Sequence, residues 1–223
     1  MKIVETVPLV DAPPPPGHFP VKALLLDIAE RGLIFAIYGQ FVVRLLHIAI
    51  DSLNIGSVLL IMSESVPLFF LLFRRFTTQV SRDPFDWSVA IVGTTMPLLV
   101  LPDPTGAPLL PAIVCDGIIT LGLCIQIAAK VSLGRSFGIV AANRGVESTG
   151  PYRFVRHPMY LGYTMTHIGF LLMMPSVLNA ILYGLAFFLQ VVRMLREENV
   201  LIQDPAYKAF ADHVRYRLLP GVF

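Results

Sequence analysis

Long apolar stretches separated by short polar turns are the main pattern along this chain. The longest of them reach the roughly 20 residues that an α-helix needs to cross the ~30 Å hydrocarbon core of a bilayer. The pattern therefore predicts an all-α fold, a polytopic membrane helix bundle with about six spans. The expected spans are residues 23–50, 55–73, 87–101, 109–133, 158–174 and 177–192.

The first of these segments is the least regular. Residues 23–50 carry Asp27, Glu30, Arg31, Arg44 and His47. Because these groups leave only a short apolar centre, we expect them to snorkel to the interface or to face neighbouring helices. A re-entrant or tilted helix is the alternative to a full span.

Polar regions lie at both ends of the sequence. Residues 1–22 include four consecutive prolines, which favour an extended tail over a helix. Residues 193–223 predict an amphipathic cytoplasmic helix and a polar tail. This C-terminal region either lies on the bilayer surface or closes as a lid over a site.

Lysine and arginine are unevenly distributed among the connections. With the N-terminus inside, the inner connections hold nearly all of them, whereas the turns near Asp51, Asp103 and Pro175 hold none. Only Arg31 and Arg44 depart from this arrangement. Since basic loops stay in the cytoplasm, we expect an integral, multi-pass protein with both termini and its functional site on the cytoplasmic side.

Composition agrees with a membrane protein and narrows the chemistry. Hydrophobic residues make up 55% of the 223 residues and charged residues 14%, against about 25% charged residues in soluble proteins. A net charge of +2, with basic residues along one membrane side, gives no reason to expect a nucleic-acid partner. Cys115 and Cys124 lie nine residues apart in one apolar segment, which favours packing roles over a metal site or a disulfide.

The connection between the fourth and fifth segments is longer than a simple turn requires. Residues 134–156 contain four arginines and four glycines, together with Asn143, Glu147 and Tyr152. Loops of this size are usually functional or disordered. The aromatic and glycine content favours an ordered loop that covers a ligand.

Cationic and aromatic residues gather where this loop meets the fifth segment. Pro158 fits a first helical turn, so the backbone N–H groups and the positive end of the helix dipole face the loop and suit an anion. Tyr160 and Gly162 follow within about one turn. The alternative is an interfacial belt of Tyr, His and Arg, which is the better interpretation of this stretch alone.

A second cluster, at the end of the sixth segment, changes that balance. Arg193 lies four residues before Glu197, so the two side chains share one helix face. Because a short turn joins the fifth and sixth segments, we expect His157, Tyr160, Arg193 and Glu197 to converge on one pocket. The alternative is a surface ion pair that contributes roughly 0.3–0.5 kcal/mol.

Three other ionisable residues lie within apolar segments. Glu64 is a functional candidate because intramembrane carboxylates are costly, but the serines on either side can satisfy it, and we expect a structural role. His47 and His167 have no acidic or cysteine partner at ligand spacing, so we expect them to pack or to lie at an interface. The chain also lacks a Gly-x-Gly-x-x-Gly turn after a strand, a Walker phosphate loop, a Gly-x-Ser-x-Gly elbow and a His-Glu-x-x-His helix.

The two clusters together resemble the isoprenylcysteine carboxyl methyltransferase family and its relatives among membrane phospholipid methyltransferases. The motifs are Gly-Pro-Tyr-Arg-x-Val-Arg-His-Pro-x-Tyr-x-Gly at residues 150–162 and Arg-x-x-x-Glu-Glu-x-x-Leu at residues 193–201. The resemblance begins near residue 133 and runs to the C-terminus. The first four segments match only in being apolar helices, and Glu147 departs from the family pattern.

The resemblance implies S-adenosylmethionine as the cofactor, held by residues 134–223, whereas residues 23–133 form the probable acceptor side. Arg193 would be the catalytic residue and would bind an acceptor carboxylate. The residues that would bind the cofactor are Arg144, Gly145, Val146, Glu147, Tyr152, His157, Pro158, Met159, Tyr160 and Glu197.

The expected function is methyl transfer to a lipophilic acceptor that enters from the bilayer. The carboxylate of a prenylated cysteine or a similar isoprenoid-linked acid is the leading acceptor, because it needs no general base and a guanidinium can align it. A phospholipid amine is the next candidate. Two other classes stay open, an NADPH-dependent membrane lipid or sterol-type reductase and a non-catalytic membrane subunit.

Overall fold

The structure is a computed structural model that describes residues 21–51, 55–100 and 107–221. Apart from an isolated bridge between Val80 and Ala142, the described residues contain helices and no strands, which confirms the all-α class. The helices are α1 (Val21–Asp51), α2 (Ile55–Leu72), α3 (Pro84–Thr95), α4 (Ala112–Leu133), α5 (Pro158–Met173), α6 (Val177–Leu201) and α7 (Pro205–His213). Short 3-10 turns occupy Met96–Leu99, Gly134–Ser136 and Gly150–Arg153.

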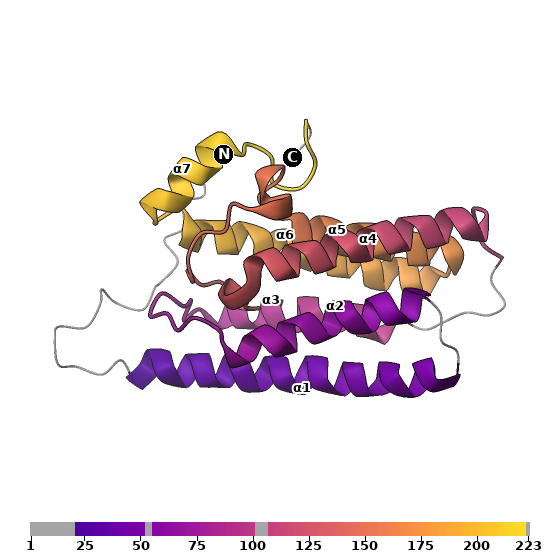
Figure 1. Cartoon of the computed structure of the whole chain (residues 1–223), viewed down its shortest axis with the longest axis horizontal. Coiled ribbons are helices and arrows are strands. Elements are labelled where there is room, and N and C mark those ends of the chain that lie inside the picture. Colours follow the sequence, from indigo (N-terminus) through magenta and orange to yellow (C-terminus); the bar gives the residue numbers. More distant parts are fainter. Residues whose placement is uncertain (1–20, 52–54, 101–106, 222–223) are drawn as a thin grey trace.

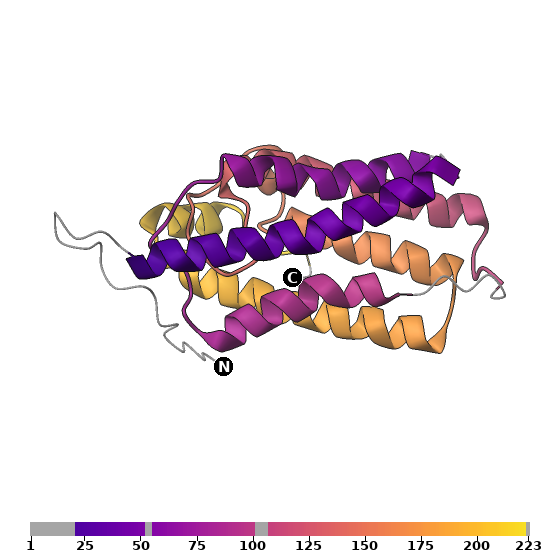
Figure 2. The same ribbon diagram turned by 90° about the horizontal axis from the view of Figure 1, so that it is seen from below.

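The long helices lie side by side in one bundle, and α7 sits at the end where α6 terminates (Figures 1 and 2). Contacts between neighbours follow the order α1, α2, α4, α5, α6 and α3, so the six helices surround a common interior. The α4–α5 pair packs closely through small residues. A Cβ atom at Gly122 would lie 2.6 Å from Thr166 Oγ1, and one at Gly162 would lie 2.6 Å from Gln126 Cγ, so only glycine permits this approach.

Two of the described helices are long and apolar enough to cross a membrane, at Ala112–Ser136 and Val177–Leu201. A shorter apolar helix covers Val58–Leu72. The outer faces of α4 and α6 expose large apolar side chains, Ile113 and Val177 among them, which suits contact with lipid. The six-span topology remains a prediction, and the tail at residues 1–20 and the side chains of Arg44 and His47 lie outside the described part of the chain.

Two predicted boundaries were wrong. The third segment was expected at residues 87–101, but α3 begins at Pro84 because Asp83 caps it, its side chain accepting the Phe85 N–H at 2.9 Å. The sixth segment was expected to end at residue 192, but α6 continues to Leu201. The C-terminal helix is therefore the separate, short α7, which Asp204 caps in the same way.

The loop between α4 and α5 is ordered, as its composition predicted. It pairs with the segment after α2, since the Ser81 N–H donates to Ala141 O and the Asn143 N–H donates to Gln79 O, both at 2.9 Å. Phe137, Ile139 and Tyr152 pack into the core cluster that includes Ile34 of α1. Gly145 has φ 101°, a left-handed conformation that favours glycine at this turn.

Candidate functional site

A small cavity lies beneath the loop, and nine of the ten residues predicted to bind the cofactor line it. Its volume is about 60 Å³. Pro158 is buried at the first position of α5 but is not part of the wall. We call this space the loop cavity; the nine residues are Arg144, Gly145, Val146, Glu147, Tyr152, His157, Met159, Tyr160 and Glu197.

Hydrogen bonds join the start of α5 to the end of α6 at this cavity. The Tyr160 hydroxyl donates to Glu197 Oε2 at 3.1 Å, and His157 Nε2 lies 3.2 Å from Glu198 Oε1. The two clusters of the sequence are therefore neighbours, as the short α5–α6 turn predicted. The partner of His157 is Glu198, however, and not Glu197.

Glu198 is a residue whose importance the sequence analysis missed. Its carboxylate accepts from Arg217 Nε at 2.6 Å and from the Tyr207 hydroxyl at 3.4 Å, and Arg156 Nε lies 3.3 Å away. The C-terminal segment also binds the backbone, since the His157 N–H donates to Arg217 O at 2.9 Å. That N–H is consequently engaged within the protein and does not serve the anion site expected at the start of α5.

Arg193 does not line the loop cavity, which corrects the expectation of a single shared pocket. Its guanidinium is buried and donates to Thr94 Oγ1 at 3.4 Å and to Gly138 O at 3.3 Å. The Arg193 Cζ atom lies 5.6 Å from the centroid of the Tyr160 ring, a cation–π distance. Tyr160 thus contacts Glu197 through its hydroxyl and Arg193 through its ring. The Arg193–Glu197 ion pair, which was the alternative to a shared pocket, is absent from the ion pairs of the described residues.

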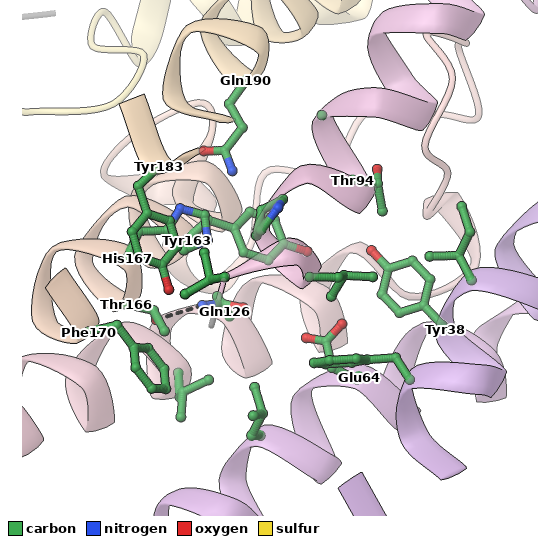
Figure 3. A pocket seen from close by; sticks show the side chains of 18 of the residues that line it. Tyr38, Glu64, Thr94, Gln126, Tyr163, Thr166, His167, Phe170, Tyr183 and Gln190 are labelled. Atoms are coloured by element: carbon green, nitrogen blue, oxygen red, sulfur yellow. Dashed lines mark hydrogen bonds between the residues drawn. The ribbon is translucent and has the colours of Figure 1, made fainter. Parts of the chain in front are cut away.

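Arg193 instead lines a larger cavity inside the bundle, which we call the bundle cavity (Figure 3). Its volume is about 290 Å³, and residues from α1 to α6 contribute to its wall. Most of the wall is apolar or aromatic, including Phe41, Leu123 and Phe170. The two cavities share no lining residue, and the Tyr160–Arg193 contact stands between them.

A buried ion pair borders the bundle cavity. Lys130 Nζ lies 2.9 Å from Glu64 Oε1, and it also donates to the carbonyl and hydroxyl oxygens of Ser63, each at 2.9 Å. The expected serine contact exists, because the Ser63 hydroxyl lies 3.1 Å from Glu64 Oε1. Lys130 supplies the compensating charge, and Glu64 forms part of the cavity wall as well.

Glu30 of α1 binds the loop at Ile139. The two residues are 109 positions apart in the sequence, so no local pattern predicts their contact. Glu30 Oε1 accepts the N–H groups of Ile139 at 2.8 Å and Val140 at 3.0 Å. Its other oxygen pairs with Arg144 and, at 3.0 Å, with Arg74. Burial lowers the pKa of the Arg144 guanidinium, and Glu30 opposes that shift by stabilising the charge. The ordered loop therefore depends on a helix that lies far away in sequence.

Helix α7 closes the remaining side of the loop cavity. Tyr207 and Phe210 line its wall, and the Asn143 amide donates to Asp204 Oδ2 at 2.8 Å. Among residues 21–51, 55–100 and 107–221, no group of three or more His, Cys, Asp and Glu side chains is placed to hold a metal ion.

Part of the chain is similar to known methyltransferases. Residues 111–207 match the family model described as phospholipid methyltransferase. A protein-S-isoprenylcysteine O-methyltransferase from Schizosaccharomyces pombe is 32% identical over 94 residues, which are 39% of this chain and 39% of the relative. The alignment thus spans about two fifths of that relative's length. Residues 111–207, which carry both sequence clusters, match the phospholipid methyltransferase family, and the resemblance to isoprenylcysteine carboxyl methyltransferases is confirmed.

Proposed function

We propose that this protein is an integral membrane methyltransferase that moves a methyl group from S-adenosylmethionine to a lipophilic acceptor. One observation carries the proposal: the Tyr160–Arg193 contact stands between a polar cavity under the loop and an apolar cavity inside the bundle. A donor in the first and an acceptor in the second would meet at this contact. The family match and the named relative support the same reaction class.

The side chains of the loop cavity suit such a cofactor. Glu147 and Glu197 provide negative charge for a sulfonium or an ammonium group, and Tyr152 and Tyr160 offer aromatic faces for a cation or a nucleobase. Arg144 Nε is buried without a hydrogen-bond partner among the described residues, so a cofactor carboxylate would satisfy it. The volume of about 60 Å³ is below the roughly 300 Å³ of typical ligand pockets, so the loop or α7 must move outward for binding.

The chemistry demands positioning more than acid–base catalysis. When bound, S-adenosylmethionine supplies an electrophilic methyl group on a sulfonium. An acceptor carboxylate is already ionised, and Arg193 would hold it at the cavity end nearest Tyr160. Glu30 and α7 would keep the loop closed, which excludes water from a charge-dispersing displacement.

The bundle cavity favours a long, lipophilic acceptor. Its wall on α6 extends from Asn179 to Arg193, 14 residues that rise about 21 Å. The positive Arg193 at one end favours a carboxylate head, such as that of a prenylated cysteine, and would repel an amine. The phospholipid amine alternative has one supporting observation, since Glu64 also lines this cavity.

The positions of the arginines indicate which end of the bundle faces the cytoplasm in this proposal. Arg74 and Arg144 pair with Glu30, which holds the loop, and Arg156 and Arg217 pair with Glu198 near the end of α6. The inside location of basic residues would place this end, and the loop cavity, in the cytoplasm. The acceptor would then reach the bundle cavity laterally from the bilayer.

Calorimetry on the purified protein tests the proposal. S-adenosylhomocysteine should bind at micromolar concentration, and NADPH should not. Labelled methyl groups should pass to N-acetyl-S-farnesylcysteine and not to phosphatidylethanolamine. NADPH binding without S-adenosylhomocysteine binding would support the reductase alternative and refute the proposal. Labelling of phosphatidylethanolamine would identify the acceptor as a phospholipid amine instead of a carboxylate.

A further inference from the structure

The bundle cavity contains polar groups that a plain hydrocarbon chain would leave without partners. Gln190 is buried, and its Oε1 atom has no hydrogen-bond partner among the residues that the structure describes. The amide points into the cavity on the side of Tyr183 and His167 (Figure 3). A buried amide oxygen without a partner loses its hydration and gains nothing in return, so its place in a cavity wall indicates a ligand that donates a hydrogen bond to it.

His167 is the second such group. Its ring is stacked between Tyr163, at a centroid distance of 6.4 Å, and Tyr183, at 4.6 Å. Within the described chain these ring contacts are its only recorded interactions, so both ring nitrogens keep their hydrogen-bonding capacity. The stack holds the imidazole in the cavity wall, where one nitrogen can donate and the other can accept.

Glu64 adds an acceptor from another helix. Lys130 and Ser63 engage its Oε1 atom, whereas its side chain also lines the cavity across from the α5–α6 wall (Figure 3). Glu64, His167 and Gln190 therefore form a polar band, contributed by α2, α5 and α6, in a cavity whose wall is mostly apolar or aromatic. By contrast, Gln126 and Thr166 satisfy each other through a 2.8 Å hydrogen bond and need no ligand.

The band lies beyond the position of the acceptor head. Gln190 is three residues from Arg193 along α6, a rise of about 4.5 Å, and Tyr183, which stacks on His167, is ten residues away, a rise of about 15 Å. An acceptor whose carboxylate meets Arg193 would therefore pass the band with the body of its chain, and not with its head.

We propose that the preferred acceptor is an oxygenated lipid, whose chain or ring carries a hydroxyl or carbonyl group roughly 5–15 Å from the methylated head. A hydroxyl can donate to Gln190 Oε1 or Glu64 and accept from His167, which would satisfy the band. This inference rests on the proposed function, because it names the acceptor class of the same reaction.

The test compares two acceptors that share one head. The first is N-acetyl-S-farnesylcysteine, and the second is its counterpart with a hydroxyl on the middle isoprene unit. The wild-type protein should methylate the hydroxylated acceptor with a kcat/KM about tenfold higher or more. In the Gln190→Leu/His167→Phe variant, which keeps the volume and the ring stack, the preference should disappear or reverse. Phe188→Leu, on the exposed face of α6, is the matched control and should keep the wild-type preference.

Binding gives a readout that does not depend on turnover. The hydroxylated amphiphile should raise the Tm of the wild-type protein more than the hydrocarbon one does, and the double variant should lose this difference. Three results would overturn the inference. The unhydroxylated acceptor would raise the Tm as much or more, neither acceptor would raise it, or the double variant would keep the preference. Failure of S-adenosylhomocysteine to bind the same preparation would refute the proposed function instead, and the amphiphile ranking would still decide the inference.

Discussion

The guanidinium of Arg193 lies against the ring face of Tyr160, with Cζ 5.6 Å from the ring centroid. The same tyrosine donates its hydroxyl to Glu197 at 3.1 Å. The Tyr160 hydroxyl therefore contacts Glu197 at the loop cavity, and the Tyr160 ring contacts Arg193 at the bundle cavity. Changes at either contact should affect different steps, which makes the two roles separable by experiment.

Loss of the Tyr160 hydroxyl should weaken cofactor binding. Tyr160→Phe keeps the ring beside Arg193 but removes the hydrogen bond that orients Glu197. A hydrogen bond to a charged group contributes about 1.5–3 kcal/mol, so the Kd for S-adenosylhomocysteine should rise roughly 10- to 150-fold in calorimetry. Tyr163→Phe is the control, since Tyr163 lines only the bundle cavity and its change should spare this Kd. An equal effect of both variants would contradict the assignment.

Replacement of Arg193 should impair turnover and spare cofactor binding. Arg193→Lys retains the charge but loses the planar, forked donors that align a carboxylate, so kcat should fall about 10²-fold or more. The affinity for S-adenosylhomocysteine should stay within about twofold of wild type, because Arg193 lies outside the loop cavity. A variant that loses cofactor affinity while keeping kcat would reverse the roles of the two cavities.

Removal of the Glu30 charge should release the loop. In Glu30→Gln, Arg144 stays buried without its carboxylate, which costs about 3–5 kcal/mol, whereas Arg74 keeps its ion pair with Asp27. The variant should have a lower Tm, and proteases should cleave it faster within residues 134–156. Asp212→Asn, an exposed change on α7, is the control. Wild-type protease resistance in Glu30→Gln would show that the core packing of Phe137 and Ile139 suffices to hold the loop.

The buried Lys130–Glu64 pair should show strong coupling. Lys130→Met leaves Glu64 as an uncompensated charge and should destabilise the protein by about 3–5 kcal/mol. Adding Glu64→Gln should recover most of that loss, because the remaining groups are neutral. Denaturant or thermal unfolding of the two single variants and the double variant gives the coupling energy. Additive losses would mean that the pair does not form in the membrane.

The contact between α7 and the loop should depend on pH. The hydrogen bond from Asn143, together with backbone N–H bonds, lowers the pKa of Asp204 below its ordinary value of 3.8. A depressed carboxyl pKa stabilises the folded state above the unfolded-state pKa, and this stabilisation is lost as the pH falls through the folded-state pKa. The protection factors of the α7 amides, which correct the exchange rates for their intrinsic pH dependence, should therefore be constant above about pH 5 and decrease at lower pH. Asn143→Ala should reduce this pH dependence, and an unchanged profile would assign it to another group.

Local signals in the sequence predicted the helices and the ordered loop, and the family resemblance implied the residues that line the loop cavity. Apolar runs located the segments, and the short turn between the fifth and sixth of them predicted that Tyr160 and Glu197 would meet. The place of Arg193 was mispredicted because helical spacing relates Arg193 to Glu197 but cannot show that the Tyr160 ring lies between them. Contacts such as that of Lys130 with Glu64, 66 residues apart, have no local signature. Their positions depend on how whole helices pack.

The Glu30 anchor also constrains the order in which the protein can assemble. Glu30 binds Ile139 and Val140 of a segment that is made 109 and 110 residues later. At roughly 5–20 residues per second, the ribosome needs several seconds to supply these partners. Arg74, which emerges 44 positions after Glu30, is the earlier counter-charge and lies 3.0 Å from it in the finished protein. The contacts of Glu30 with the loop therefore form only after residues 139–144 have been synthesised, whereas its pair with Arg74 is available earlier and persists in the folded protein.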